Sequence, residues 1–242
     1  MARLFEERLR HGILVADGAM GTQLYERGVR LDECFEAINL HASHLVLEIH
    51  RAYILAGAEL IETNTFGANR FKLANFGLAD RVREINRKGV RLAREAREIC
   101  GVPVFVAGAV GPTGRLLEPY GTVAPEAVRD AFREQIEALL EGGVDVLVFE
   151  TMSQLAEIRE AIAAAREVCD LPIVAQMTFA ADGRTLAGHS PEEVIEALAE
   201  LGVSAVGVNC SVGPRPTVAI LQRMAAVNRW GLPLSRSEER RV

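Results

Sequence analysis

The sequence predicts an α/β fold: a (β/α)8 TIM barrel, incomplete at the C-terminus, with about six to seven strands present. Short apolar segments alternate six times with longer amphipathic segments, an order that gives parallel strands joined by helical crossovers. Polar side chains follow the carboxyl end of nearly every apolar segment, as they do in barrels whose sites form at that face. The two common glycine motifs of nucleotide-binding open sheets do not occur in the sequence.

Composition and charge restrict the class of protein further. Of 242 residues, 49% are hydrophobic and 25% charged, which suits a globular core and excludes a disordered chain. The net charge of -6 and the lack of an internal basic run argue against nucleic acid and anionic membranes as partners. The sequence has neither a run of ~20 apolar residues nor a signal peptide. We therefore expect a cytoplasmic protein.

The predicted strands are apolar throughout, which is typical of parallel strands that are covered on both faces. They lie at residues 13–16, 59–61, 104–107, 144–149, 173–177 and 205–208, and a seventh begins at 232.

The predicted helices have a periodic apolar face and clear boundary residues. Ser190 is an N-cap followed by a proline at the first helical position and a capping-box glutamate, and glycines such as Gly101 and Gly202 follow helix ends. The helices are expected at residues 43–56, 78–98, 125–141, 153–168 and 191–201.

The alternating pattern stops after Ser235. Residues 236–242 are highly polar and have no apolar face, and they occur before an eighth strand is possible. We therefore divide the chain into a barrel at residues 1–235 and a polar tail at residues 236–242.

Asp17 ends the first predicted strand and begins the glycine-rich segment 17–22. One interpretation is a turn in which the aspartate caps and a glycine adopts positive φ. The other is an amino-acid site, where the carboxylate holds an ammonium and nearby backbone N–H groups hold a carboxylate.

Glu150 follows an apolar strand, so the barrel rim partly desolvates it and it needs a cation. That cation is either a local arginine or an ammonium shared with Asp17.

Cys210 follows Asn209 at the end of the sixth predicted strand, at the barrel mouth. A nucleophilic cysteine needs a histidine base, and nothing marks the nearest histidine, His189, as one. A single thiol is too few for zinc, which takes three protein ligands in catalytic sites. The spacing alone therefore favours an inert thiol. The other cysteines, Cys34, Cys100 and Cys169, form no motif and are predicted to be unpaired, as in a reducing compartment.

Together these motifs resemble the homocysteine S-methyltransferase family. This is the barrel domain of methionine synthase, of betaine-homocysteine methyltransferase and of bifunctional proteins that join it to a methylenetetrahydrofolate reductase. The matching segments occur in family order within about residues 3–235, at 17–22, 62–70, 111–114, 149–151, 177–179 and 208–214.

The resemblance implies a zinc enzyme that transfers a methyl group to the thiol of homocysteine, giving methionine. The family's substrate carboxylates correspond to Asp17 and Glu150, which hold the amino group of homocysteine. The backbone of Gly18, Ala19 and Met20 receives its carboxylate. Zinc replaces the thiol proton, so that a thiolate meets the methyl donor.

The resemblance makes Cys210 a zinc ligand, and in the family two further ligands come from a Cys-Cys pair on the last strand. This sequence contains no adjacent cysteines, so we expect an incomplete zinc site and a C-terminally truncated domain, explained by a frameshift or a truncated gene model. Zinc binding should be weak and activity doubtful. The alternatives are a non-catalytic amino-acid-binding barrel and an inactive remnant.

The resemblance does not identify the methyl donor. Within the family the donor is methyltetrahydrofolate by way of cobalamin, betaine or S-methylmethionine. The expected partners are therefore homocysteine and either a donor domain or a small-molecule donor.

Overall fold

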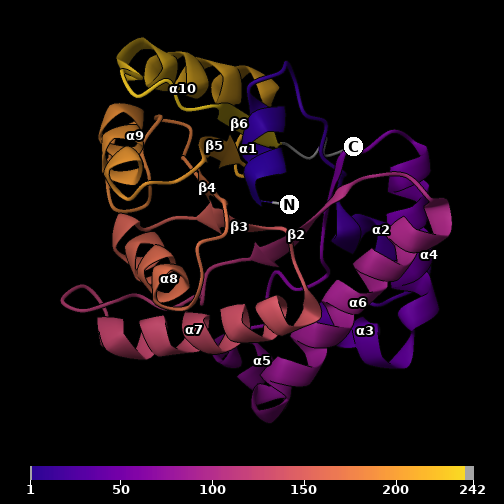
Figure 1. Cartoon of the computed structure of the whole chain (residues 1–242). Coiled ribbons are helices and arrows are strands. Elements are labelled where there is room, and N and C mark those ends of the chain that lie inside the picture. Colours follow the sequence, from indigo (N-terminus) through magenta and orange to yellow (C-terminus); the bar gives the residue numbers. More distant parts are fainter. Residues whose placement is uncertain (1, 238–242) are drawn as a thin grey trace.

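The computed structural model of the chain describes residues 2–237. Its centre is a parallel sheet in the order β1-β2-β3-β4-β5-β6. The sheet curls into a half-barrel with helices around its outer side (Figure 1). This arrangement confirms the prediction of an incomplete barrel. The strands are β1 (Leu60–Glu62), β2 (Phe105–Val110), β3 (Val146–Met152), β4 (Ile173–Met177), β5 (Ala205–Asn209) and β6 (Leu234–Ser237).

Both ends of the predicted strand series differ from expectation. Residues 13–16 form no regular strand: Ala16 makes one isolated bridge to Leu60. Ile13 is 86% exposed and Val15 52% exposed, so their β-branched side chains lack the packing that stabilises a strand. At the other end, β6 continues through Ser237, into the stretch predicted as a polar tail. Residues 238–242 of that tail lie outside the described residues.

The helices connect successive strands and include all five that the sequence predicts. Helix α6 begins later than predicted because its first turn is a 3-10 turn. Helix α10 was not predicted. Pro214 and Pro216 both lie in its first turn, where proline is tolerated. The helices are α1 (Ala2–Leu9), α2 (Met20–Glu26), α3 (Ile38–His41), α4 (Ser43–Leu55), α5 (Arg70–Ala74), α6 (Val82–Cys100), α7 (Pro125–Gly142), α8 (Leu155–Val168), α9 (Pro191–Glu200) and α10 (Pro214–Val227), with 3-10 turns η1 (Phe35–Ala37) and η2 (Ala79–Arg81).

The predicted capping box at the start of α9 is present. The Glu193 backbone N–H donates to Ser190 Oγ over 3.3 Å, and the Ser190 N–H donates to Glu193 Oε2 over 2.7 Å. Two N–H groups that the helix leaves without partners are thereby satisfied.

Apolar side chains pack on both faces of the sheet. The outer face packs against the helices in the largest core cluster. On the inner face, Phe5 of α1 enters the half-barrel and meets Phe105 edge to face, with ring centroids 5.2 Å apart. Side chains alternate between the two faces of a strand, so Leu60 and Glu62 both point inward from β1. Glu150 follows Val148 in the same way on β3.

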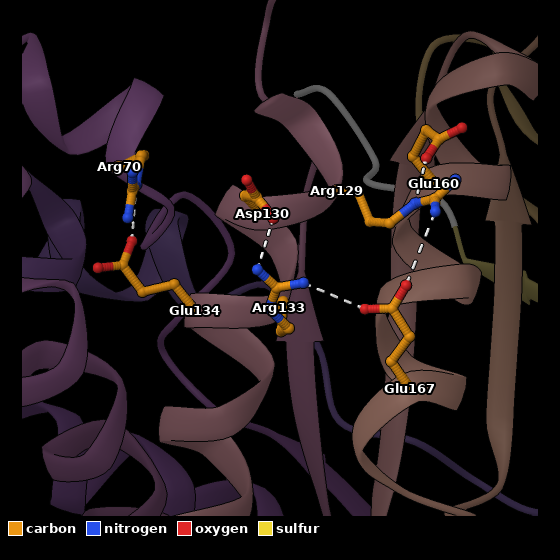
Figure 2. A network of polar contacts seen from close by, with 7 residues as sticks. All are labelled: Arg70, Arg129, Asp130, Arg133, Glu134, Glu160 and Glu167. Atoms are coloured by element: carbon orange, nitrogen blue, oxygen red, sulfur yellow. Dashed lines mark hydrogen bonds and ion pairs between the residues drawn. The ribbon is translucent and has the colours of Figure 1, made fainter. Parts of the chain in front are cut away.

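Ion pairs link α7 with the helices on either side of it (Figure 2). Exposed pairs of this kind contribute about 0–1 kcal/mol each, so they help to orient the helices and add little to stability. The main contacts are Arg70 to Glu134 at 2.8 Å, Arg129 to Glu160 at 2.7 Å and Arg133 to Glu167 at 3.2 Å. Within residues 2–237, no helix has the length and hydropathy to cross a lipid bilayer.

Candidate functional site

A cavity of about 1080 Å³ occupies the inside of the half-barrel and reaches the carboxyl ends of its strands. Its floor includes apolar residues of the inner cluster, such as Phe5 and Leu60. Segments far apart in sequence form its wall, because parallel strands bring their carboxyl ends to the same side. The wall contains every residue predicted for the site: Asp17, Gly18, Ala19, Met20, Glu150 and Cys210.

Three carboxyl groups meet in this wall. Asp17 Oδ2 accepts a hydrogen bond from the Glu62 backbone N–H over 3.0 Å. The Glu62 and Glu150 side chains are in hydrogen-bonding contact across β2. The residue that β2 contributes to the wall is Ala109, whose methyl group leaves room for the two longer side chains to meet.

Burial raises the pKa of all three carboxyl groups. The pKa of Asp17 is raised well above its usual value, first by burial and then by the charge of Glu62. The pKa of Glu150 is also raised well above its usual value, by burial and then by Glu62 and Asp17. Burial raises the pKa of Glu62, although its hydrogen bond with Glu150 opposes the shift. Within the described residues, no cationic side chain contributes to these shifts.

Backbone N–H groups lie beside this acidic cluster. Those of Gly18, Ala19 and Met20 donate to no acceptor within residues 2–237, as expected at the start of a helix. Tyr53 packs against the segment and donates its hydroxyl to the Ala19 carbonyl over 3.0 Å. A Cβ at Gly18 would lie 2.9 Å from the Tyr53 hydroxyl oxygen, so any side chain at this position would force Tyr53 to move.

Asn209 connects the acidic cluster to the thiol of Cys210. Its Nδ2 donates to Glu150 Oε2 over 3.2 Å and lies 3.5 Å from Cys210 Sγ. Its Oδ1 accepts from the Thr151 N–H over 2.7 Å. Thr151 and Cys210 have φ values of 60° and 57°, a left-handed conformation that non-glycine residues adopt mainly where surrounding contacts impose it, often at functional sites.

The described residues do not fit a zinc site. Zinc requires at least three protein ligands, and among residues 2–237 no group of three or more His, Cys, Asp or Glu side chains is placed to hold a metal ion. Of the described cysteines, Cys210 is the one in the cavity wall; Cys34, Cys100 and Cys169 do not line it. A single thiol does not hold a catalytic zinc ion.

The sequence pattern assigned no individual role to Glu62, the first residue of segment 62–70, or to Asn209, which precedes Cys210. The signal for Glu62 is the one that identified Glu150: a carboxylate directly after an apolar strand. Asn209 gave no comparable signal, because its role depends on contacts between β3 and β5.

Comparison with known proteins agrees with this geometry. Residues 14–237 match the sequence model of the homocysteine S-methyltransferase family. The chain belongs to this family. The methionine synthase of Mycobacterium tuberculosis is 34% identical over 220 residues, which are 85% of this chain and 18% of that protein. The Mycobacterium leprae methionine synthase is 33% identical over 222 residues, 86% of this chain and 18% of that protein. This family member therefore spans less than one fifth of the curated relatives it matches.

Solved structures show the same fold as this homocysteine S-methyltransferase family member. The metallated form of the homocysteine methyltransferase MmuM from Escherichia coli is 29% identical, with a TM-score of 0.82 over 96% of this chain and 85% of that chain. Its oxidized form is 28% identical, with a TM-score of 0.80 over 95% and 92% of the two chains. The carboxyl transferase domain of Rhizobium etli pyruvate carboxylase, at 15% identity and a TM-score of 0.59 over 97% of this chain and 37% of that chain, shares the fold alone.

Proposed function

We propose that this chain binds L-homocysteine by its amino and carboxylate groups and presents the homocysteine thiol for methyl transfer, which forms methionine. The observation that carries this proposal is the meeting of Asp17 and Glu150 with Cys210 in the wall of one cavity. The family membership and the similarity to MmuM support the same reaction class.

The binding step follows from the charges in the wall. Asp17 and Glu150 hold the ammonium group, whose positive charge compensates their buried negative charge. The N–H groups of Gly18, Ala19 and Met20 have no acceptor within the described part of the chain and receive the carboxylate. These contacts fix both ends of the amino-acid group and direct the side chain of homocysteine along the cavity wall.

The transfer step needs a nucleophilic sulfur. A thiol with a pKa of about 8.5 is mostly protonated at neutral pH, and the zinc ion implied by the resemblance would supply the thiolate. Because the described residues do not complete that site, we derive no step through the metal. The protein's own contribution is orientation: a substrate held at two points keeps its sulfur in line with an incoming methyl group.

The donor and the location are further parts of the proposal. The donor is either a separate domain that carries a methyl group from methyltetrahydrofolate through cobalamin, or a small molecule such as betaine or S-methylmethionine. The described cysteines are free thiols, which supports a reducing compartment such as the cytoplasm.

A second candidate is a non-catalytic barrel that binds an amino acid. The single thiol in the described cavity wall favours it, because the clamp for the amino acid is present while the ligands for zinc are too few. The two candidates make the same prediction for binding and opposite predictions for turnover.

One experiment separates them. The chain is mixed with L-homocysteine and zinc, and methylcobalamin, betaine or S-methylmethionine is added in parallel; binding is followed by calorimetry and methionine by mass spectrometry. Saturable binding with enzyme-dependent methionine supports methyl transfer. Binding without methionine from any donor supports the non-catalytic barrel, and the absence of homocysteine binding contradicts both.

A further inference from the structure

Glu62 has no part in the binding scheme given above, yet it lies between the two carboxyl groups that hold the ammonium. We propose that Glu62 and Glu150 share one proton when the cavity is free of ligand, and that the substrate ammonium displaces this proton on binding. This inference rests on the proposed function, because it requires an ammonium group to enter between Asp17 and Glu150.

The contact between the two glutamates requires a proton. An ionised carboxylate only accepts hydrogen bonds, so two carboxyl groups in hydrogen-bonding contact, as Glu62 and Glu150 are, need a proton on one of them. Two carboxylates this close do not both remain ionised in a buried site. The proton belongs to the pair, and the pair titrates as a unit.

The surrounding contacts hold this pair in place. Asn209 Nδ2 donates to Glu150 Oε2 over 3.2 Å, and the Glu62 backbone N–H donates to Asp17 Oδ2 over 3.0 Å. Each of these donors bonds one carboxyl group, Glu150 or Asp17. The shared proton supplies the hydrogen for the contact between Glu62 and Glu150.

The other charged groups in the wall do not replace the proton. Glu36 of η1 and Arg236 of β6 also line the cavity, as does the thiol of Cys210. None of them is among the groups that shift the pKa of Asp17, Glu62 or Glu150. The neighbouring strand β4 contributes Gln176, which is neutral. Within the described residues, the cluster is therefore compensated by protons and not by a cationic side chain.

A substrate ammonium can take the place of the shared proton in compensating the buried negative charge. It carries a full positive charge and three N–H donors, enough to bond each carboxyl group of the cluster. Its own N–H bonds stay intact. The O–H bond of the shared carboxyl breaks, the proton passes to the buffer, and the freed carboxylate oxygen accepts a hydrogen bond from the ammonium.

The test counts protons released on binding by titrating the chain with L-methionine near pH 7 in the presence of EDTA. Methionine carries the same ammonium but has no thiol proton, so any proton released at this pH comes from the protein. Calorimetry in phosphate and in Tris, whose ionisation enthalpies differ, gives the number released. We expect up to about one proton per methionine for the wild type.

Two variants make the result specific. Glu62→Gln can still hydrogen-bond Glu150 but leaves no proton to share, so we expect binding within about tenfold of wild type and almost no proton release. The control is Glu157→Gln. Glu157 is another buried carboxyl group with a pKa raised by burial, but it accepts from Thr113 and does not line the cavity. Its substitution should leave proton release unchanged.

A second measurement needs no variant. In infrared difference spectra of the wild type, methionine should reduce the carbonyl band of a protonated carboxylic acid. Methionine binding without proton release, with an unchanged band, or with equal release in Glu62→Gln overturns the inference and leaves the proposed binding intact. Absence of both methionine and homocysteine binding contradicts the proposed function, and the inference falls with it.

Discussion

Asp17 shows how one side chain can serve two purposes. Its backbone N–H donates to the Leu60 carbonyl over 2.9 Å and its Oδ2 accepts from the Glu62 N–H over 3.0 Å, so it fixes segment 13–16 beside β1. The same carboxyl group faces the cavity together with Glu150. The turn interpretation of Asp17 is wrong in its details: Ala19 is the N-cap of α2 and no side chain caps this helix, and neither Gly18 nor Gly21 has a positive φ. The carboxyl group instead bonds the backbone of β1.

The role of Asp17 can be tested by Asp17→Asn. The amide keeps an acceptor for the Glu62 N–H but loses the negative charge that attracts an ammonium. Because hydrogen bonds to charged groups contribute about 1.5–3 kcal/mol, homocysteine affinity should fall roughly 10- to 100-fold in calorimetry. Glu137→Gln, on the exposed face of α7, is the matched control. Unchanged affinity in Asp17→Asn would show that the clamp is wrongly assigned.

His50 of α4 is a second residue with a measurable consequence. It is fully buried, neither ring nitrogen has a hydrogen-bond partner in the described structure, and burial lowers its pKa from 6.5 to about 4. Above pH 6.5 the His50 ring is neutral in both the folded and the unfolded chain. As pH falls from 6.5 towards 4, the unfolded chain gains a proton that the folded chain does not, so this contribution to stability is lost.

The predicted result for His50 is a difference between two pH profiles. Between pH 7 and pH 5, the wild type should lose about 1–2 kcal/mol more stability than His50→Leu, which has no group to titrate. Urea denaturation at a series of pH values measures this. Parallel profiles for the two proteins would mean that His50 is not held neutral in the fold.

At the scale of elements, some strands and helices are determined by local sequence signals and others by long-range contacts. The apolar strands and the capped helices were predictable because periodicity and boundary residues are local properties. Segment 13–16 has the apolar composition of a strand, but its single bridge to β1 depends on what packs beside it. Helix α10 begins with two prolines whose effect depends on their position in the first turn.

The candidate site likewise has features that the sequence predicts and features that depend on the folded sheet. Asp17, Glu150 and Cys210 could be placed together because each follows a predicted strand, and parallel strands end on one side. The contact between Glu62 and Glu150 could not be predicted, because it depends on the small side chain of Ala109 on the strand between them. Which side chains meet across a strand is a property of the folded sheet.

Helix boundaries and surface ion pairs should differ in their effect on stability. Ser190→Ala removes the hydroxyl that caps α9 and should cost about 1 kcal/mol. Glu167→Ala removes contacts of α8 with Arg133 at 3.2 Å and Arg129 at 3.7 Å (Figure 2), yet should cost less than about 0.5 kcal/mol because the groups are exposed. Chemical denaturation measures the loss of unfolding free energy in each variant. A larger loss in Glu167→Ala than in Ser190→Ala would contradict this prediction.

At the scale of the whole molecule, the half-barrel gathers an acidic clamp and one thiol around one cavity. The fold supplies these groups from several strand ends, so residues as far apart in sequence as Asp17 and Cys210 line one cavity of about 1080 Å³. Burial of these carboxyl groups lowers the stability of the ligand-free protein at neutral pH. Under the proposed function, binding of the substrate ammonium would raise it.

The zinc content of the whole chain can also be predicted. After removal of loosely bound ions by dialysis, the 242-residue chain should retain well below one zinc ion per molecule, because one thiol does not provide the three or more ligands that zinc needs. Elemental analysis by mass spectrometry gives the ratio. Tightly held zinc at one ion per chain would contradict this prediction.

The central claim is that the cavity recognises an amino acid by its ammonium group. The most direct measurement is a calorimetric titration of the wild-type chain with L-homocysteine and, separately, with 4-mercaptobutyrate, which has the same thiol, chain and carboxylate but no amino group. We predict saturable binding of homocysteine and affinity at least 100-fold lower for 4-mercaptobutyrate. Equal affinity for the two compounds would contradict the claim.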